Sequence, residues 1–353
     1  MFKRLGLAVY LSRFDKQKPM LEKMAGSGYT VFTSFHIQEE YETIENYAEQ
    51  AREMVRWLKD HEYTVLADLS PRSIDYLEAT SIENVLHAIP IDMVRPDYGF
   101  SVETIKTMAR THDIVLNAST LDKTLLESLE ATSGNIYAMH NFYPREETGL
   151  DRSLFEAMNR TMRPHIKGII AFIPGDAQKR GPIEKGLPTL EAHRDKPPYV
   201  GYLDLILRHG CEAVFVGDIR LSETQLRLID RFNTDGVISL PVVFTKDYEH
   251  LFEKVFTIRP DSPTPLKRLQ ESREYASHGA SIEPNDTLAR PKGTITIDNV
   301  RYQRYSGEIQ ITAADYPEDE RINVIGHMEE AYVDALESVK NNQKIRFVRL
   351  NNN

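Results

Sequence analysis

The chain has 353 residues, of which 41% are hydrophobic and 27% charged, as in an ordinary soluble globular protein. Its 43 basic and 53 acidic residues give a formal net charge of −10, which argues against nucleic acid or an anionic membrane as the main partner. No segment approaches the ~20 apolar residues of a membrane span. The single cysteine, Cys211, excludes an intramolecular disulfide and suits a reducing compartment, so a cytoplasmic location is expected.

Short apolar runs alternate with helical patterns as far as about residue 235, which is typical of βα units around a parallel sheet. The runs predicted to be strands are Leu5–Leu11, Thr30–Phe35, Thr64–Leu69, Met93–Tyr98, Asp113–Ala118, Ile136–Phe142, Gly168–Ile173 and Glu212–Asp218. The clearest helix pattern, Glu39–Asp60, has apolar residues at three- and four-residue steps. Eight such units fit a (β/α)₈ TIM barrel, which takes about 250 residues. The alternative, an open doubly wound sheet, would usually carry a glycine-rich first turn, which this chain lacks.

One connection is much longer than the others. Residues 174–199 are rich in glycine, proline and charge and show no clean helical or strand period. Loops of this length in compact domains are usually functional or disordered. Because this loop follows the seventh strand, it would lie on the active face of a barrel, and we expect it to be functional.

The pattern changes after Asp235. Residues 236–265 contain three prolines near their end and are predicted to connect the barrel, residues 1–235, to a small domain, residues 266–353. In the small domain, strands are expected at Thr294–Ile297, Val300–Tyr305, Glu308–Thr312 and Ile345–Leu350, with an amphipathic helix over residues 325–339. This combination indicates a small, β-rich fold.

In a barrel, polar residues at the carboxyl ends of the strands converge on one site, because the strand bodies are filled by apolar layers. The stretch 134–150, GNIYAMHNFYPREETGL, shows this most clearly, since His140, Asn141 and Tyr143 follow a short buried strand. The polar residues at the other strand ends are Tyr10, Ser12, Ser34, His36, Asp68, Ser70, Arg72, Arg95, Asp97, Tyr98, Asn117, Ser119, Asp218 and Arg220.

Asp68 and Asp97 are the candidates for acid and base chemistry. Asp68 ends a strand expected to be buried on both faces, where an unpaired carboxylate would be costly, so a structural pairing with Arg72 or Arg95 is the alternative. Asp97 lies two residues after Arg95, which points both side chains the same way and makes a structural ion pair equally plausible. Two carboxylates on neighbouring strands can divide acid and base roles, as in glycoside hydrolysis.

Metal and cofactor chemistry has weaker support. His140, His193 and Asp218 have only generic spacing for metal ligands, and no lysine stands at a strand end for Schiff-base chemistry. No phosphate-loop, dinucleotide-binding or kinase motif is present. We therefore expect neither a metal nor a cofactor. The long loop adds Glu191, His193 and Arg194, for which surface solvation is the alternative to a role in binding.

Three motifs, RPDYGF, HNFYPREETGL and GPIEKGLPTLEAHR, resemble in order and spacing those of the bacterial MupG-type 6-phospho-N-acetylmuramidases. The resemblance covers nearly the whole chain. It implies a TIM barrel followed by a cyclophilin-like β-rich domain. It also implies cytoplasmic hydrolysis of the disaccharide MurNAc-6-phosphate-β-1,4-GlcNAc to MurNAc-6-phosphate and GlcNAc during cell-wall recycling. The alternatives left open are a phosphosugar isomerase or aldolase, and a non-catalytic phosphosugar-binding protein.

With this substrate in view, Asp68 and Asp97 are predicted to be the catalytic carboxylates. A phosphorylated sugar needs a local cationic site in an acidic protein, for which Arg72, Arg95, Arg194 and Arg220 are the candidates. The residues predicted to bind substrate are Arg72, Arg95, Asn117, His140, Asn141, Tyr143, Glu191, His193, Arg194 and Asp218. The small domain is expected to complete the cleft or to form a homodimer.

Overall fold

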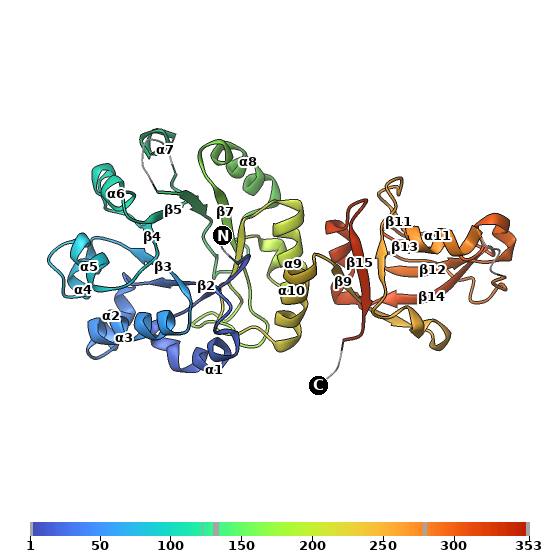
Figure 1. Ribbon diagram of the computed structural model, residues 1–353, viewed down its shortest axis with the longest axis horizontal. Helices are drawn as coiled ribbons and strands as arrows, with labels where there is room; N and C mark the ends of the chain where they lie inside the picture. Colours follow the sequence, from blue (N-terminus) through green and yellow to red (C-terminus); the bar gives the residue numbers. More distant parts are fainter. Residues whose placement is uncertain (1–2, 122, 130–133, 278–280, 351–353) are drawn as a thin grey trace. The chain divides into compact units, whose positions relative to one another are not determined.

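The computed structural model describes residues 3–121, 123–129, 134–277 and 281–350. The chain divides into two compact units, Met1–Ser222 and Glu223–Asn353. Each unit is built on its own sheet, and Figure 1 shows both, with labels on many of their helices and strands.

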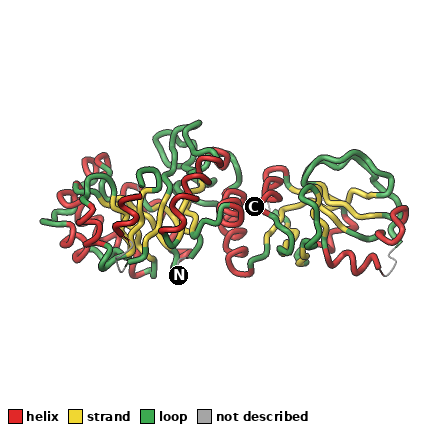
Figure 2. Tube along the Cα trace, turned by 90° about the horizontal axis from the view of Figure 1, so that it is seen from above, coloured by secondary structure: helices red, strands yellow, loops and turns green. Residues whose placement is uncertain are grey.

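The first unit contains a closed barrel of eight parallel strands, in which β1 pairs with both β2 and β8. Its strands are β1 (Leu5–Ala8), β2 (Thr30–Ser34), β3 (Thr64–Leu69), β4 (Met93–Pro96), β5 (Asp113–Asn117), β6 (Ile136–Met139), β7 (Gly168–Ile173) and β8 (Ala213–Val216). Each lies inside one of the predicted runs. In Figure 2 the strands of this unit lie at its centre with helices outside them. The predicted (β/α)₈ barrel is therefore confirmed.

The helices of the first unit follow the strands in turn. They are η1 (Leu11–Arg13), α1 (Phe14–Met24), α2 (Gln38–Thr43), α3 (Tyr47–Asp60), α4 (Arg72–Tyr76), α5 (Ile82–Ala88), α6 (Val102–Met108), α7 (Lys123–Leu129), α8 (Arg152–Met162), η2 (Arg163–His165), η3 (Glu191–His193), α9 (Pro198–Leu203) and η4 (Asp204–Arg208). The prediction of one helix over 39–60 was wrong. The break falls at Asn46, whose φ of 51° is left-handed, a conformation that asparagine tolerates better than most residues.

The barrel interior is packed with side chains that alternate along each strand. Phe172 is at its centre, with ring centroids 5.7 Å from Phe32 and 6.0 Å from Phe215 in edge-to-face contacts. Phe215 in turn occupies the space beside Gly6 on β1, where a Cβ atom would lie 2.3 Å from the ring. The absence of a side chain at Gly6 therefore allows the aromatic layer to close the barrel.

The second unit contains a seven-stranded sheet in the order β10-β15-β9-β14-β12-β13-β11. Its strands are β9 (Ile238–Phe244), β10 (Val255–Thr257), β11 (Leu266–Arg268), β12 (Thr294–Asp298), β13 (Ile309–Thr312), β14 (Ile322–Met328) and β15 (Lys344–Val348). Its helices are α10 (Glu223–Asp235), η5 (Lys246–Leu251), α11 (Gln270–Ser277), η6 (Val300–Tyr305) and η7 (Glu330–Ser338). Residues 236–265, expected to connect two domains, contribute β9 and β10 to this sheet. None of the described helices is both long enough and apolar enough to cross a bilayer.

Two predicted elements of this unit were wrong. The expected strand Val300–Tyr305 is η6, which consists of 3₁₀ turns on either side of a kink at Gln303, and at its start the Asn299 side chain accepts a hydrogen bond from the Arg301 amide. The expected helix over 325–339 is strand β14 followed by η7. Ile325 and Met328 fit a helical spacing, but both belong to the strand, which pairs with β9 and β12. Short apolar runs do not separate strand from helix by spacing alone.

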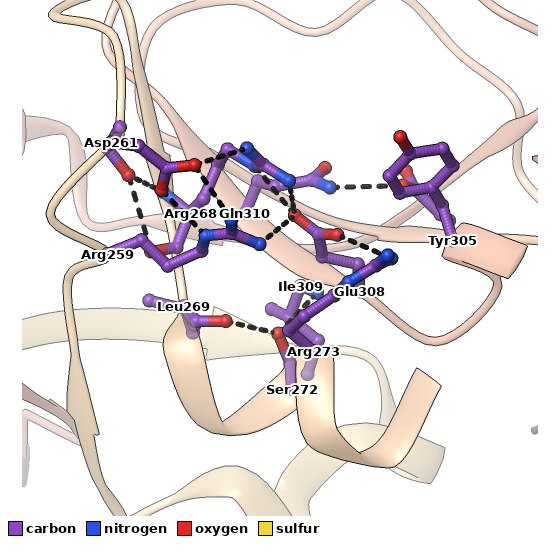
Figure 3. Close-up of polar contacts among 12 residues, drawn as sticks. Arg259, Asp261, Arg268, Leu269, Ser272, Arg273, Tyr305, Glu308, Ile309 and Gln310 are labelled. Atoms are coloured by element: carbon purple, nitrogen blue, oxygen red, sulfur yellow. Dashed lines mark hydrogen bonds and ion pairs between the residues drawn. The ribbon is translucent and has the colours of Figure 1, made fainter. Parts of the chain in front are cut away.

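A network of charged side chains joins β11 and α11 to Glu308, the residue before β13, in the second unit (Figure 3). The carboxylate of Glu308, which is almost fully buried, lies 2.6 Å from Arg268, 3.4 Å from Arg273 and 3.9 Å from Arg259. Asp261 forms a further ion pair of 2.8 Å with Arg259. A carboxylate at this depth requires such partners, because an uncompensated buried charge is strongly destabilising.

Gly6→Ala should destabilise the barrel by roughly 1–3 kcal/mol, the usual cost of overpacking a core, because the Phe215 ring has no free space to move into. The only tryptophan, Trp57, lies in the barrel unit, so its fluorescence during urea unfolding reports on this unit. Gly181→Ala is the matched control, since its added Cβ would meet nothing closer than 3.9 Å. An unchanged midpoint for Gly6→Ala would contradict the packing described here.

Candidate active site

A cavity of about 520 Å³ opens at the carboxyl ends of the barrel strands. Its apolar lining includes Phe32 and Phe172, the top of the aromatic layer inside the barrel. Of the residues predicted to act on substrate, the cavity brings together Asp68, Arg95, Asp97, Asn117, His140, Asn141 and Tyr143. The expectation that polar residues at the carboxyl ends of the strands converge, here called the strand-end rule, therefore placed most of the predicted residues in one cavity.

The strand register explains why Asp68 and Arg95 meet. The two residues are direct partners in the β3–β4 pairing, and side chains two apart on a strand share a face, so Asp68 points inward like Leu66. Both residues are only 5% exposed. Arg95 Nη1 lies 2.9 Å from Asp68 Oδ1, and Arg95 Nη2 donates to Asn141 Oδ1 at 2.7 Å. Arg95 is thereby fixed between β3 and the end of β6.

Asp97 lies beside this pair, nearer to solvent. Its Oδ1 atom is 3.9 Å from Arg95 Nη1, and its Oδ2 atom is 3.2 Å from His36 Nε2. The other imidazole nitrogen, His36 Nδ1, lies 3.8 Å from Asp68 Oδ2. The two carboxylates therefore flank both a guanidinium and an imidazole. Arg95 Nη1 lies 2.9 Å from Asp68 Oδ1 and 3.9 Å from Asp97 Oδ1. The two Oδ1 atoms can therefore be no farther apart than the sum of these two distances.

The environments of the two carboxylates differ. Burial raises the pKa of Asp68, while the Arg95 guanidinium opposes part of that rise. The Asp97 side chain is 28% exposed, compared with 7% for that of Asp68. A buried carboxyl group beside a more exposed one is the arrangement by which enzymes separate an acid from a base.

His140 lines the cavity and is hydrogen-bonded to a residue of α8. It is completely buried, and its Nε2 atom lies 2.7 Å from Asn159 Oδ1 on α8. Burial lowers the pKa of His140 to about 4, so its imidazole is neutral at pH 7. Within the described chain, its Nδ1 atom has no hydrogen-bond partner. Because Nε2 donates to Asn159, Nδ1 of this neutral ring is a hydrogen-bond acceptor, and the ring cannot supply a positive charge.

Glu191 and Arg194 do not line the cavity and instead join two loops. Arg194 Nε and Nη2 bond the two oxygens of Glu191 at 2.6 and 2.7 Å, and Nη2 also donates to the Tyr143 carbonyl at 3.0 Å. Glu191 accepts hydrogen bonds from the amides of Glu147 and Gly149 at 3.0 and 2.8 Å. A Cβ at Gly149 would lie 2.5 Å from Glu191 Oε2, so this approach requires glycine. We call this arrangement the Glu191–Arg194 clamp.

Three other predicted residues also lie outside the cavity lining. His193 is buried, and its Nε2 atom is 2.8 Å from Asp204 Oδ2. Asp218 is buried and accepts three backbone hydrogen bonds from the long loop. Arg72 is exposed at the start of α4, with Nη1 3.4 Å from Gln38 Oε1. Their observed contacts are with the protein itself, so any influence on a ligand would act through the position of other groups.

The cavity lining also includes residues that were not predicted to act on substrate. Tyr10 and His36 were among the strand-end residues, whereas Glu39 lies on α2 and Arg180 lies on the long loop after β7. The strand-end rule cannot identify residues beyond the strand ends, because it depends on the alternation of side chains within a strand. In the part of the chain that the structure describes, no group of three or more histidine, cysteine or acidic residues is arranged to hold a metal ion.

Glu191→Gln should loosen the clamp, because the charge-assisted bonds to Arg194 are lost; that pairing holds the pKa of Glu191 down at about 2. Hydrogen exchange at the Glu147 and Gly149 amides should accelerate by about tenfold, as expected for weakening one such bond. Glu184→Gln, an exposed substitution in the same long loop, is the control. Equal exchange in the two variants would show that Glu191 does not hold these loops together.

Comparisons with known proteins agree with this architecture. Residues 5–231 match the family model described as 6-phospho-N-acetylmuramidase, N-terminal, and residues 238–348 match its C-terminal counterpart. The crystal structure of a conserved Enterococcus faecalis protein of unknown function is 29% identical, with a TM-score of 0.84 over 98% of this chain and 96% of the other.

An uncharacterised B. cereus protein of known crystal structure shares the fold, with a TM-score of 0.79 and 24% identity over 99% of this chain and 100% of that one. A search among curated proteins gives no match. The two family models together span nearly the whole chain and indicate a 6-phospho-N-acetylmuramidase-type glycosidase. The chain therefore belongs to the 6-phospho-N-acetylmuramidase family.

Proposed function

We propose that this protein hydrolyses MurNAc-6-phosphate-β-1,4-GlcNAc to MurNAc-6-phosphate and GlcNAc in the cytoplasm, as a step in peptidoglycan recycling. The observation that carries the proposal is the pair of carboxylates, Asp68 and Asp97, facing one cavity and sharing Arg95 and His36. Family membership supports the glycosidic reaction.

The contacts of the two carboxylates with Arg95 limit how far apart they can lie. Carboxyl pairs are about 5–5.5 Å apart in retaining glycosidases and roughly 6.5–9.5 Å apart in inverting ones. The shared Arg95 contacts of 2.9 and 3.9 Å allow the first range and only the lower edge of the second. In this proposal Asp68 protonates the leaving oxygen, because burial favours its protonated form. Asp97 acts as the second carboxylate, either toward the sugar directly or through its 2-acetamido group.

The cavity offers surfaces of the kind that sugars bind. Its volume of about 520 Å³ falls within the ~300–1,000 Å³ typical of small-molecule sites. Phe142 and Tyr143 contribute aromatic side chains to its lining, and Asn117 and Asn141 contribute amide groups that can bond hydroxyls. Among the described residues, the lining contains no lysine, so Schiff-base aldolase chemistry has no nucleophile there.

The direct test is to incubate the purified protein with the phosphorylated disaccharide and with its unphosphorylated counterpart, and to follow the products by mass spectrometry. The phosphorylated compound should give equimolar MurNAc-6-phosphate and GlcNAc, and the unphosphorylated one should react far more slowly. Binding without cleavage would instead support a phosphosugar-binding protein and refute the enzymatic proposal.

Asp68→Asn and Asp97→Asn should each lower kcat by about 10²–10⁴-fold, the usual contribution of a positioned acid or base, with the fold retained. Asp60→Asn, an exposed change at the end of α3, is the matched control. The acid must be protonated to act, so wild-type kcat should fall as pH rises through the raised pKa of Asp68. An alkaline limb that persists unchanged in the residual activity of Asp68→Asn would exclude Asp68 as the acid.

A further inference from the structure

We propose that Arg180, on the long loop after β7, binds the phosphate of the substrate and sets the preference for phosphorylated sugars. This inference rests on the proposed function, because it assigns one anionic group of that substrate to a place in the cavity. Arg180 was not among the residues that the sequence singled out.

The first argument is charge. The cavity lining includes two arginines, Arg95 and Arg180, in the part of the chain that the structure describes. The Arg95 guanidinium is already engaged by the protein, since it lies 2.9 Å from Asp68 and 3.9 Å from Asp97 and donates a hydrogen bond to Asn141 at 2.7 Å. By contrast, no described carboxylate lies within ion-pair distance of the Arg180 guanidinium. Arg180 is therefore the cation in this cavity whose charge is left for a ligand.

The second argument is orientation. The Arg180 guanidinium lies over the Tyr10 ring, with its Cζ atom 4.0 Å from the ring centroid. Tyr10 is itself fixed, because its hydroxyl donates to the Gly217 carbonyl at 2.5 Å and its backbone amide donates to Gln17 at 3.0 Å. The Tyr10 side chain therefore holds the Arg180 guanidinium at this place in the cavity, and a guanidinium is a planar fork of N–H donors that can bind phosphate in a bidentate manner.

The third argument is the way in which the loop is held. Asp218, just after β8, accepts hydrogen bonds from the amides of Gly175 at 2.8 Å, Arg180 at 2.8 Å and Leu187 at 3.1 Å. These amides are therefore occupied by the carboxylate of the protein and are not available to an anionic ligand. Because one of them belongs to Arg180, the same contact fixes the backbone from which the guanidinium extends.

The fourth argument is position around the barrel. Phosphate sites of TIM barrels are frequently formed by the loops after strands 7 and 8. Arg180 follows β7, and its support comes from Tyr10 after β1 and Asp218 after β8. Of the two carboxylates, Asp68 lies near the end of β3 and Asp97 follows β4. A substrate held at Arg180 by its phosphate would thus extend across the cavity toward Asp68 and Asp97.

The test is Arg180→Gln, compared with Arg56→Gln, which removes a guanidinium from the exposed face of α3. Arg180→Gln should lower kcat/KM for the phosphorylated disaccharide by at least 100-fold and change that for the unphosphorylated one by less than threefold. Arg56→Gln should change neither. Equal losses on both substrates, or no loss on either, would overturn the assignment.

A binding measurement separates failure of this inference from failure of the proposed function. Titration calorimetry with inorganic phosphate and with N-acetylglucosamine 6-phosphate needs no turnover. Both should bind the wild-type protein and the Arg56→Gln variant, and binding to Arg180→Gln should be weakened at least tenfold. If the protein binds these anions through Arg180 yet cleaves no disaccharide, the proposed reaction fails and the anion site stands. Undiminished binding to Arg180→Gln would refute the site itself.

Discussion

The ion pair between Arg95 and Asp68 is the contact on which the whole site depends. Two charged side chains are buried inside the mouth of a barrel, and each would be strongly destabilising without the other. Once paired, Arg95 also donates a hydrogen bond to Asn141 through Nη2 and lies 3.9 Å from Asp97 through Nη1. The pair therefore fixes the groups on both sides of it. Arg95 therefore stabilises Asp68 in its ionised form, while burial favours the protonated form.

Much of the fold could be predicted from the sequence, because alternation within strands is a local property. It placed Asp68, Arg95, Asp97 and Asn117 at strand ends, and closure of the barrel then brings such residues together. The loops could not be predicted in this way. Their side chains are positioned by contacts distant in sequence, so that Arg194 was expected in the site whereas Arg180 is found there.

The second unit shows the same limit in its secondary structure. The apolar spacing of residues 325–339 matches a helix, yet pairing with β9 and β12 makes its first part a strand. Such pairing depends on segments about 30 and 80 residues away and leaves no signal in a local window. Asn46 is a related case, since the apolar stripe continues across it while the backbone does not.

The Glu191–Arg194 clamp has a consequence for the order of assembly during folding. It joins residues 143–149, which follow β6, to residues 185–194, which follow β7, so it can form only after those two strands are side by side. Local strand and helix contacts need no such prior closure. The two loops that the clamp joins should therefore be among the last parts of the barrel to become native, and among the first to be lost when the protein begins to unfold.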